Sequence, residues 1–267
     1  MQGEGNHPEG WKIETGNSPV LAAAIHDGHH VRPDIEALMN ISEEQRLREE
    51  DPFTANWTKI TPDRIIVSRS RFEVDLNRPI DLAVYREPNL SWGLNVYRQL
   101  PCPRQTKRTL FNYFNFYSAV FTLLHRKVHQ YGRVVIIDLH SYNHRRSGPN
   151  APPADPAENP EVNIGTGTVQ NRDQWANVIN QFIYDLHSFD FGGRNLDVRE
   201  NIKFKGGNFA ERIHRTFGSS VLVLSVEFKK FFMDEWTGQS FPNQLALIEA
   251  SLLSTLPNLT KALRPSS

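Results

Sequence analysis

The sequence is very poor in cysteine. Its 267 residues contain one, Cys102, so the chain cannot form an internal disulfide. A zinc site built from several thiolates is excluded for the same reason. Any metal ion must therefore be held by histidine and carboxylate side chains.

Long apolar runs and an excess of charge of one sign are also missing. No run approaches the ~20 residues that cross a bilayer, and the polar N-terminus lacks the basic start and apolar stretch of a secretory signal. Thirty basic residues balance thirty acidic ones, so net charge would not attract nucleic acid or an anionic membrane. We expect a cytoplasmic protein that acts on a small molecule, without a nucleic-acid or membrane partner.

Two familiar enzyme motifs are absent. No GxSxG sequence occurs, which argues against the strand-turn-helix serine of the α/β-hydrolases. Gly165-Thr-Gly167 lacks the third glycine of a dinucleotide-binding loop, and we interpret it as a turn.

Three short runs of apolar residues each end in a chemically active side chain: residues 20–26 end in His26, 134–140 in His140 and 220–227 in Glu227. Near-continuous apolar strands are typical of a parallel sheet that is covered on both faces. Such a sheet collects its ligands at the carboxyl ends of the strands. The three side chains are therefore expected to meet in one site.

Helical periodicity accounts for much of the remaining chain. Helices are predicted at 42–50, 109–128, 171–188, 208–217 and 243–256, from apolar residues spaced by three and four. The second should end at Gly132. The expected architecture is a single α/β domain over 1–267, with three α/β/α layers and a mixed, largely parallel sheet. Residues 88–103 and the proline-rich segment 143–160 are predicted to be functional loops.

His26 and His140 are the first candidate ligands of one zinc ion. Zinc in catalytic sites takes about three protein ligands and keeps a position for water. The alternative is that each histidine is a hydrogen-bonded structural residue. His29 and His30 follow in the same turn as His26, and either could be a ligand or an ordinary loop residue.

The third ligand should be a carboxylate from Glu49-Glu50-Asp51, which ends a predicted helix. Three acids at a helix C-terminus are unfavourable with the helix dipole, and a nearby cation would explain them. Glu50 is favoured over Asp51. The alternative is a solvated helix end.

Residues 71–78 alternate polar and apolar side chains, which predicts a strand with Arg71 and Asn77 on its polar face. Guanidinium groups match carboxylates, so Asn77 and Arg78 could anchor an acidic substrate while Arg71 faces the scissile carbonyl. A surface strand with salt bridges is the alternative. Glu227 is the candidate general base, unless it forms a buried ion pair with a neighbouring lysine.

One ordered set of motifs resembles the N-formylglutamate amidohydrolase family, and it covers most of the chain. The motifs are His26-Asp-Gly28, Glu50-Asp51, Val74-Asp-Leu-Asn-Arg78, Asp138-Leu-His-Ser141, Asn163-Ile-Gly-Thr166 and Lys205-Gly-Gly207. The order of His, acid, Asn-Arg, His and Glu is also similar to that of the zinc carboxypeptidases.

The resemblance implies a zinc-exopeptidase fold, one zinc ion per chain and hydrolysis of an acidic N-acyl amino acid, most specifically N-formyl-L-glutamate to L-glutamate and formate. By that resemblance His26, Glu50 and His140 are zinc ligands; His29 and Asp51 stay weaker candidates, because they lie close to His26 and Glu50 in the sequence. Arg71, Asn77 and Arg78 bind substrate, and Glu227 is the catalytic glutamate.

The chain departs from the family pattern in two places. Asp-Gly-His-His follows Ile25-His26, where Pro-His-Ser-Gly is usual, and the strand of His140 continues into Tyr142-Asn-His-Arg-Arg146. Tyr142 and Arg145 are therefore added to the expected substrate-binding residues. The alternatives are a carboxypeptidase or other acyl-amino-acid deacylase on the same fold, or a small-molecule binding protein without activity.

Overall fold

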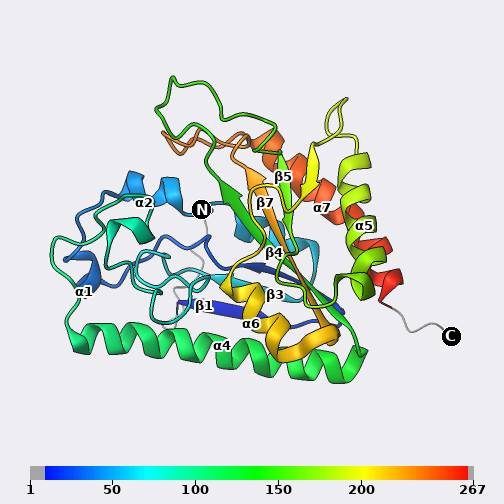
Figure 1. Ribbon diagram of the computed structural model, residues 1–267, viewed down its shortest axis with the longest axis horizontal. Coiled ribbons are helices and arrows are strands. Elements are labelled where there is room, and N and C mark those ends of the chain that lie inside the picture. The colour runs from blue at the N-terminus through cyan, green and yellow to red at the C-terminus, as the bar shows by residue number, and fades with distance from the viewer. Residues whose placement is uncertain (1–9, 264–267) are drawn as a thin grey trace.

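The computed structural model describes residues 10–263; residues 1–9, which are the first part of the polar N-terminus, and residues 264–267 lie outside the described part. Seven strands form one sheet in the order β1-β3-β2-β4-β7-β5-β6 (Figure 1). The strands are β1 (Trp11–Glu14), β2 (Val20–Ala24), β3 (Arg64–Val67), β4 (Val134–Tyr142), β5 (Val162–Gly165), β6 (Val198–Glu200) and β7 (Val221–Lys229).

The centre of the sheet is parallel. Strands β3, β2, β4 and β7 run in one direction. At one edge β1 pairs antiparallel with β3. On the other side β5 is antiparallel to β7 and parallel to β6. The predicted mixed, largely parallel α/β sheet is confirmed.

Helices cover both faces of the sheet (Figure 1). They are α1 (Pro33–Glu36), α2 (Glu43–Glu49), α3 (Thr54–Trp57), α4 (Pro103–Tyr131), α5 (Arg172–Ser188), α6 (Asn208–Phe217) and α7 (Pro242–Ala262), with short 3₁₀ turns η1 (Thr58–Ile60), η2 (Pro88–Leu90) and η3 (Gly218–Ser220). Alternate residues of each central strand point to opposite faces. One set packs with α4 and α6, and the other with α5 and α7.

The predicted helices all form, with differences at their ends. Helix α6 has the predicted bounds. Helix α4 ends at Gly132 as predicted, but it begins at Pro103, where the side chain of Gln105 accepts a hydrogen bond from the backbone N–H of Cys102. Proline at the first helical position removes no hydrogen bond. Helix α7 continues through Pro257 to Ala262, beyond the predicted end.

The predicted strand at 71–78 is wrong. The segment forms successive turns, in which the N–H of Glu73 donates to the carbonyl of Ser70 and that of Arg78 to Asp75. Its apolar side chains are buried, but its polar side chains Glu73 and Asp75 are buried as well. The alternation therefore comes from polar side chains that are buried in a network beside the apolar core. A strand with one solvent-exposed face would show the same sequence pattern.

The remaining segments are mainly loops. Residues 143–161 join β4 to β5 without a helix or strand. A smaller apolar cluster, which includes Ile35, Phe72 and Tyr85, supports the loops between β3 and α4. Among the helices of residues 10–263, none combines the length and apolar character needed to cross a membrane.

Candidate metal centre and substrate pocket

Three parallel strands deliver the candidate site. His26 lies two residues beyond β2, while His140 lies in β4 and Glu227 in β7. In the register of β4 and β7, His140 is directly opposite Glu227. The carboxyl ends of the three strands therefore lie close together, as predicted, because parallel neighbouring strands end at the same edge of the sheet.

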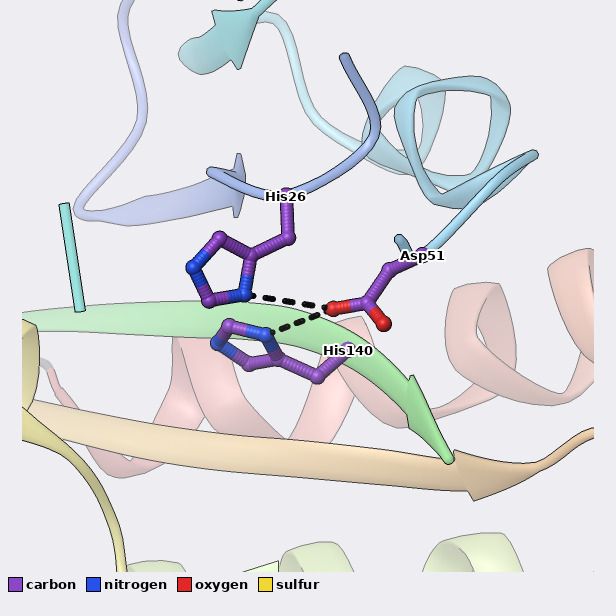
Figure 2. Close-up of side chains that lie close together, drawn as sticks. All are labelled: His26, Asp51 and His140. Carbon is purple, nitrogen blue, oxygen red and sulfur yellow. Dashed lines mark hydrogen bonds and ion pairs between the residues drawn. The ribbon is translucent and has the colours of Figure 1, made fainter. Parts of the chain in front are cut away.

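His26, Asp51 and His140 form a compact, buried cluster (Figure 2). One donor atom from each lies within 4.8 Å of the others. Asp51 Oδ2 is 3.0 Å from His140 Nδ1 and 3.4 Å from His26 Nδ1. Asp51 enters the cluster from the end of α2, and its N–H donates to the carbonyl of His26. This hydrogen bond ties the two segments together.

A second carboxylate lies behind each imidazole. His26 Nε2 is 2.7 Å from Asp75 Oδ1, and His140 Nε2 is 3.0 Å from Asp138 Oδ2. Because an ionised carboxylate only accepts hydrogen bonds, Asp75 places the proton of a neutral His26 on Nε2 and leaves the Nδ1 lone pair toward the cluster. Histidines that bind metal are usually oriented by such a carboxylate on the far nitrogen.

The donor set fits a metal ion. His26 Nδ1 is buried and makes no hydrogen bond within the described residues, which is costly for a polar atom unless another partner satisfies it. Two imidazole nitrogens and one carboxylate are a typical set of zinc ligands, and they leave a coordination position open. His26, Asp51 and His140 could therefore hold a metal ion.

The electrostatics of the cluster favour a cation. Burial opposes ionisation of Asp51, but the hydrogen bond with His140 and the nearby ring of His26 outweigh it and hold the pKa of Asp51 well below its usual range. Burial also opposes protonation of His140, but Asp138 and Glu227 raise its pKa above the ordinary value. The raised pKa of His140 reports the negative charge of Asp138 and Glu227 around its ring, and the same charge suits a bound cation.

Glu227 faces the same cavity. Burial raises its pKa to about 7, and His140 opposes this shift while Asp51 adds to it. The lysine that could have formed an ion pair, Lys230, instead donates to the carbonyl oxygens of Arg48 and Glu50, at 2.6 and 2.8 Å. A carboxylate with a pKa near neutrality can exchange protons efficiently at neutral pH.

Glu50, the favoured third ligand, points away from the cluster. Its carboxylate accepts a hydrogen bond from Ser70 and lies 2.5 Å from His29 Nδ1. Glu50 is the C-cap of α2 and has an extended backbone. Successive side chains of extended backbone point in opposite directions, so Asp51 faces the two imidazoles. The structure therefore places Asp51 in the predicted position of Glu50, and His29 beside Glu50.

The cluster opens into a cavity of about 220 Å³. Four of the five predicted substrate-facing residues line it: Arg71, Asn77, Arg78 and Tyr142. The fifth, Arg145, does not line it and instead donates to the carbonyl of Ala151. The next residue, Arg146, lines the cavity, and a bidentate pair with Glu49 at 3.0 and 2.9 Å holds it.

Surrounding groups hold the arginines and Asn77 in place. Arg71 donates to Asp75 at 2.9 Å and to the Tyr85 hydroxyl at 3.2 Å. Arg78 is more exposed and reaches the carbonyl of Leu90 at 3.5 Å. The amide oxygen of Asn77 accepts the N–H of Phe209 at 2.9 Å. The cavity is therefore lined with fixed donors that suit carboxylates.

Sequence reasoning did not assign a role to several residues of the site. Asp75 and Asp138 lie within the motifs named above. Asp138 is two residues before His140 in β4, so strand alternation places both on one face, whereas the distance of Asp75 from His26 in the sequence gives no such sign. Trp92, Arg146 and Lys230 line the cavity, and no pattern in the sequence singles out Trp92. Apart from Asp138, these residues come from segments outside the helices and strands, and their partners are distant in the chain.

The fold and the site define an α/β protein with a candidate His-Asp-His metal centre in an arginine-lined pocket. The sequence model described as N-formylglutamate amidohydrolase matches residues 18–233. The chain belongs to the N-formylglutamate amidohydrolase family.

Solved structures agree with this assignment in fold. The chain is similar to an N-formylglutamate amidohydrolase from Ralstonia eutropha, with a TM-score of 0.75 and 14% identity, over 96% of this chain and 98% of the other. It is also similar to a gene product from Agrobacterium tumefaciens, with a TM-score of 0.67 and 15% identity, over 95% of this chain and 96% of the other. A search among curated proteins finds no match.

Proposed function

We propose that this protein is a zinc-dependent amidohydrolase that converts N-formyl-L-glutamate to L-glutamate and formate. The single observation that carries this proposal is the convergence of His26, Asp51 and His140 at the base of a cavity that also contains Glu227. Membership of the family supports amide hydrolysis as the reaction.

Each part of the site has a proposed task. His26, Asp51 and His140 would hold the zinc ion, which in such sites acts as a Lewis acid on the carbonyl oxygen and acidifies water. Glu227 would accept a proton from the attacking water and transfer it to the departing nitrogen. Arg71 would stabilise charge on the carbonyl oxygen.

The remaining donors would bind the substrate's carboxylates. Arg78 and Arg146 bring guanidinium groups to the cavity, and Asn77 adds an amide. N-formyl-L-glutamate carries two carboxylates, which suits more than one guanidinium. Tyr142 lines the wall, while its hydroxyl donates to the carbonyl of Pro160.

The size of the cavity favours a single acyl-amino acid over a peptide. Its volume is about 220 Å³, which lies below the roughly 300–1,000 Å³ of typical ligand pockets. A carboxypeptidase on this fold would need more space for the residues before the scissile bond. We therefore favour the deformylase over the carboxypeptidase.

Metal analysis together with a release assay tests the proposal. The purified protein is expected to contain about one zinc ion per chain, as a catalytic His-Asp-His site requires, and to release formate from N-formyl-L-glutamate. Removal of the metal by a chelator should abolish this release, and added zinc should restore it. N-acetyl-L-glutamate and a dipeptide that ends in glutamate complete the substrate panel.

Two histidine variants provide a matched comparison. His140→Ala should lose both metal and formate release, whereas His30→Ala, an exposed residue in the turn that follows His26, should keep both. Full release without metal would contradict the zinc mechanism. Cleavage of the dipeptide without formate release would favour the carboxypeptidase.

A further inference from the structure

Trp92 occupies a backbone position that is unfavourable for a large side chain. Residues Ser91 to Leu94 form a turn in which the N–H of Leu94 donates to the carbonyl of Ser91 at 2.9 Å. The two central residues, Trp92 and Gly93, have φ angles of 54° and 85°. Positive φ at both central positions favours Asn-Gly. A tryptophan at the first of these positions costs free energy and calls for a compensating role.

Packing accounts for the other such residues better than for Trp92. Within residues 10–263, positive φ at a residue other than glycine occurs at Phe53, Trp92 and Asn201. Asparagine tolerates this conformation. The ring of Phe53 packs on Phe232 at the edge of the main core. Trp92 also contacts the rings of Phe72 and Tyr85, but it remains 41% exposed.

The exposed indole lines the same cavity as the metal cluster. The guanidinium carbon of Arg71 lies 4.7 Å from its ring centroid, and that of Arg146 lies 5.8 Å away. Asp75 and Glu49 hold these guanidinium groups through ion pairs. The indole is therefore an apolar wall between two fixed cations.

We propose that Trp92 determines which substrates the pocket accepts, by covering the hydrocarbon part of an acidic acyl-amino acid while Arg146 binds a carboxylate and Arg71 faces the carbonyl oxygen of the scissile amide. This inference rests on the proposed function for its substrate class. A ligand with carboxylates separated by CH₂ groups matches both features of the wall, since the indole buries the CH₂ groups and the cations receive the charges. Contact with the ligand would offset the unfavourable turn conformation.

Binding of glutarate tests the inference without any need for turnover. Glutarate has the carboxylate spacing of the glutamate side chain and main chain, and titration calorimetry on the purified protein measures its affinity. Trp92→Asn is expected to weaken glutarate binding roughly fivefold or more, with metal content unchanged. The better fit of Asn to the turn opposes the loss of the ring contacts with Phe72 and Tyr85, so the variant should remain folded, which its unfolding temperature checks. Trp92→Phe, which keeps an aromatic ring, should lose less affinity.

Phe111→Ala provides the control, because Phe111 is an exposed aromatic residue of α4 that does not line this cavity. It should leave glutarate binding unchanged. Equal affinity of wild type and Trp92→Asn, or no binding of glutarate to the wild type, would overturn the inference. Formate release is measured separately, so a wild-type protein that binds glutarate through Trp92 but releases no formate would count against the proposed function alone.

Discussion

Glu227 is the residue on which the proposed proton transfer depends. It lies opposite His140 in the register of β4 and β7, and it lines the cavity that contains the metal cluster. Its raised pKa of about 7 follows first from burial. A base with a pKa near the working pH combines a useful ionised fraction with good proton affinity.

Replacement of Glu227 by Gln removes the ionisable group and keeps the shape of the side chain. We expect Glu227→Gln to retain the wild-type metal content and to lose hydrolysis by ~100-fold or more, the usual contribution of a general base. Steady-state kinetics with N-formyl-L-glutamate and metal analysis on one preparation check both parts. Glu211→Gln, an exposed carboxylate on α6, should change neither, and undiminished turnover of Glu227→Gln would remove this residue from the mechanism.

Helix α6 receives its N-terminal cap from a distant loop. Gly207 precedes the helix and has no side chain to cap it. Asn77 supplies this hydrogen bond, because its amide oxygen accepts the N–H of Phe209. An ideal Cβ placed on Gly207 would lie 2.3–2.5 Å from atoms of the Asn77 side chain. The absence of a side chain at Gly207 therefore lets α6 approach the pocket.

Gly207→Ala is expected to displace Asn77. The crowding should lower the free energy of unfolding by about 1–3 kcal/mol and raise KM for N-formyl-L-glutamate, because Asn77 lines the pocket. Chemical denaturation and kinetics measure the two effects. In an Asn77→Ala background, where the clashing atoms are gone, Gly207→Ala should cost less stability, and equal costs in both backgrounds would argue against the clash.

At the scale of the whole molecule, His214 joins α6, β7 and the loop after β5. Its Nε2 accepts the N–H of Val223 at 2.9 Å, and its Nδ1 lies 2.9 Å from the Thr168 hydroxyl. Burial lowers the pKa of His214 from 6.5 to about 4. The folded protein therefore keeps this ring neutral at mildly acidic pH, where the unfolded chain binds a proton.

This difference predicts a loss of stability in acid. The contribution of His214 is fully present above its unfolded pKa of 6.5 and falls as the pH decreases toward about 4, by up to roughly 3 kcal/mol. His214→Gln preserves one acceptor and one donor without a titrating group. The free energy of unfolding can be measured by chemical denaturation between pH 7 and pH 4, at roughly half-unit steps. It should decrease less with falling pH for the variant than for the wild type.

His129→Gln, an exposed residue on α4, is the matched control and should follow the wild-type pH dependence. If His214→Gln loses stability in acid as steeply as the wild type, His214 does not contribute to the acid sensitivity.

Local patterns in the sequence were sufficient for the framework and for part of the site. The apolar runs that become β2, β4 and β7 are buried on both faces, so composition alone indicates their place in the sheet. Parallel strands bring their carboxyl ends together, so His26, His140 and Glu227 could be assigned to one site before their distances were known. Helical periodicity located α2, α4, α5, α6 and α7 for the same local reason, whereas the four-residue helices α1 and α3 are too short to show a period.

The tertiary structure decided which neighbours in sequence face the site. Glu50 and Asp51 are chemically alike and adjacent, and the extended backbone at the end of α2 selects Asp51. The same holds for Arg145 and Arg146 in a loop. Trp92 reaches the cavity through a turn with positive φ angles. Sequence patterns record burial along the chain, whereas the direction of a side chain at a helix end or in a loop depends on contacts with distant segments, and only the folded chain supplies these.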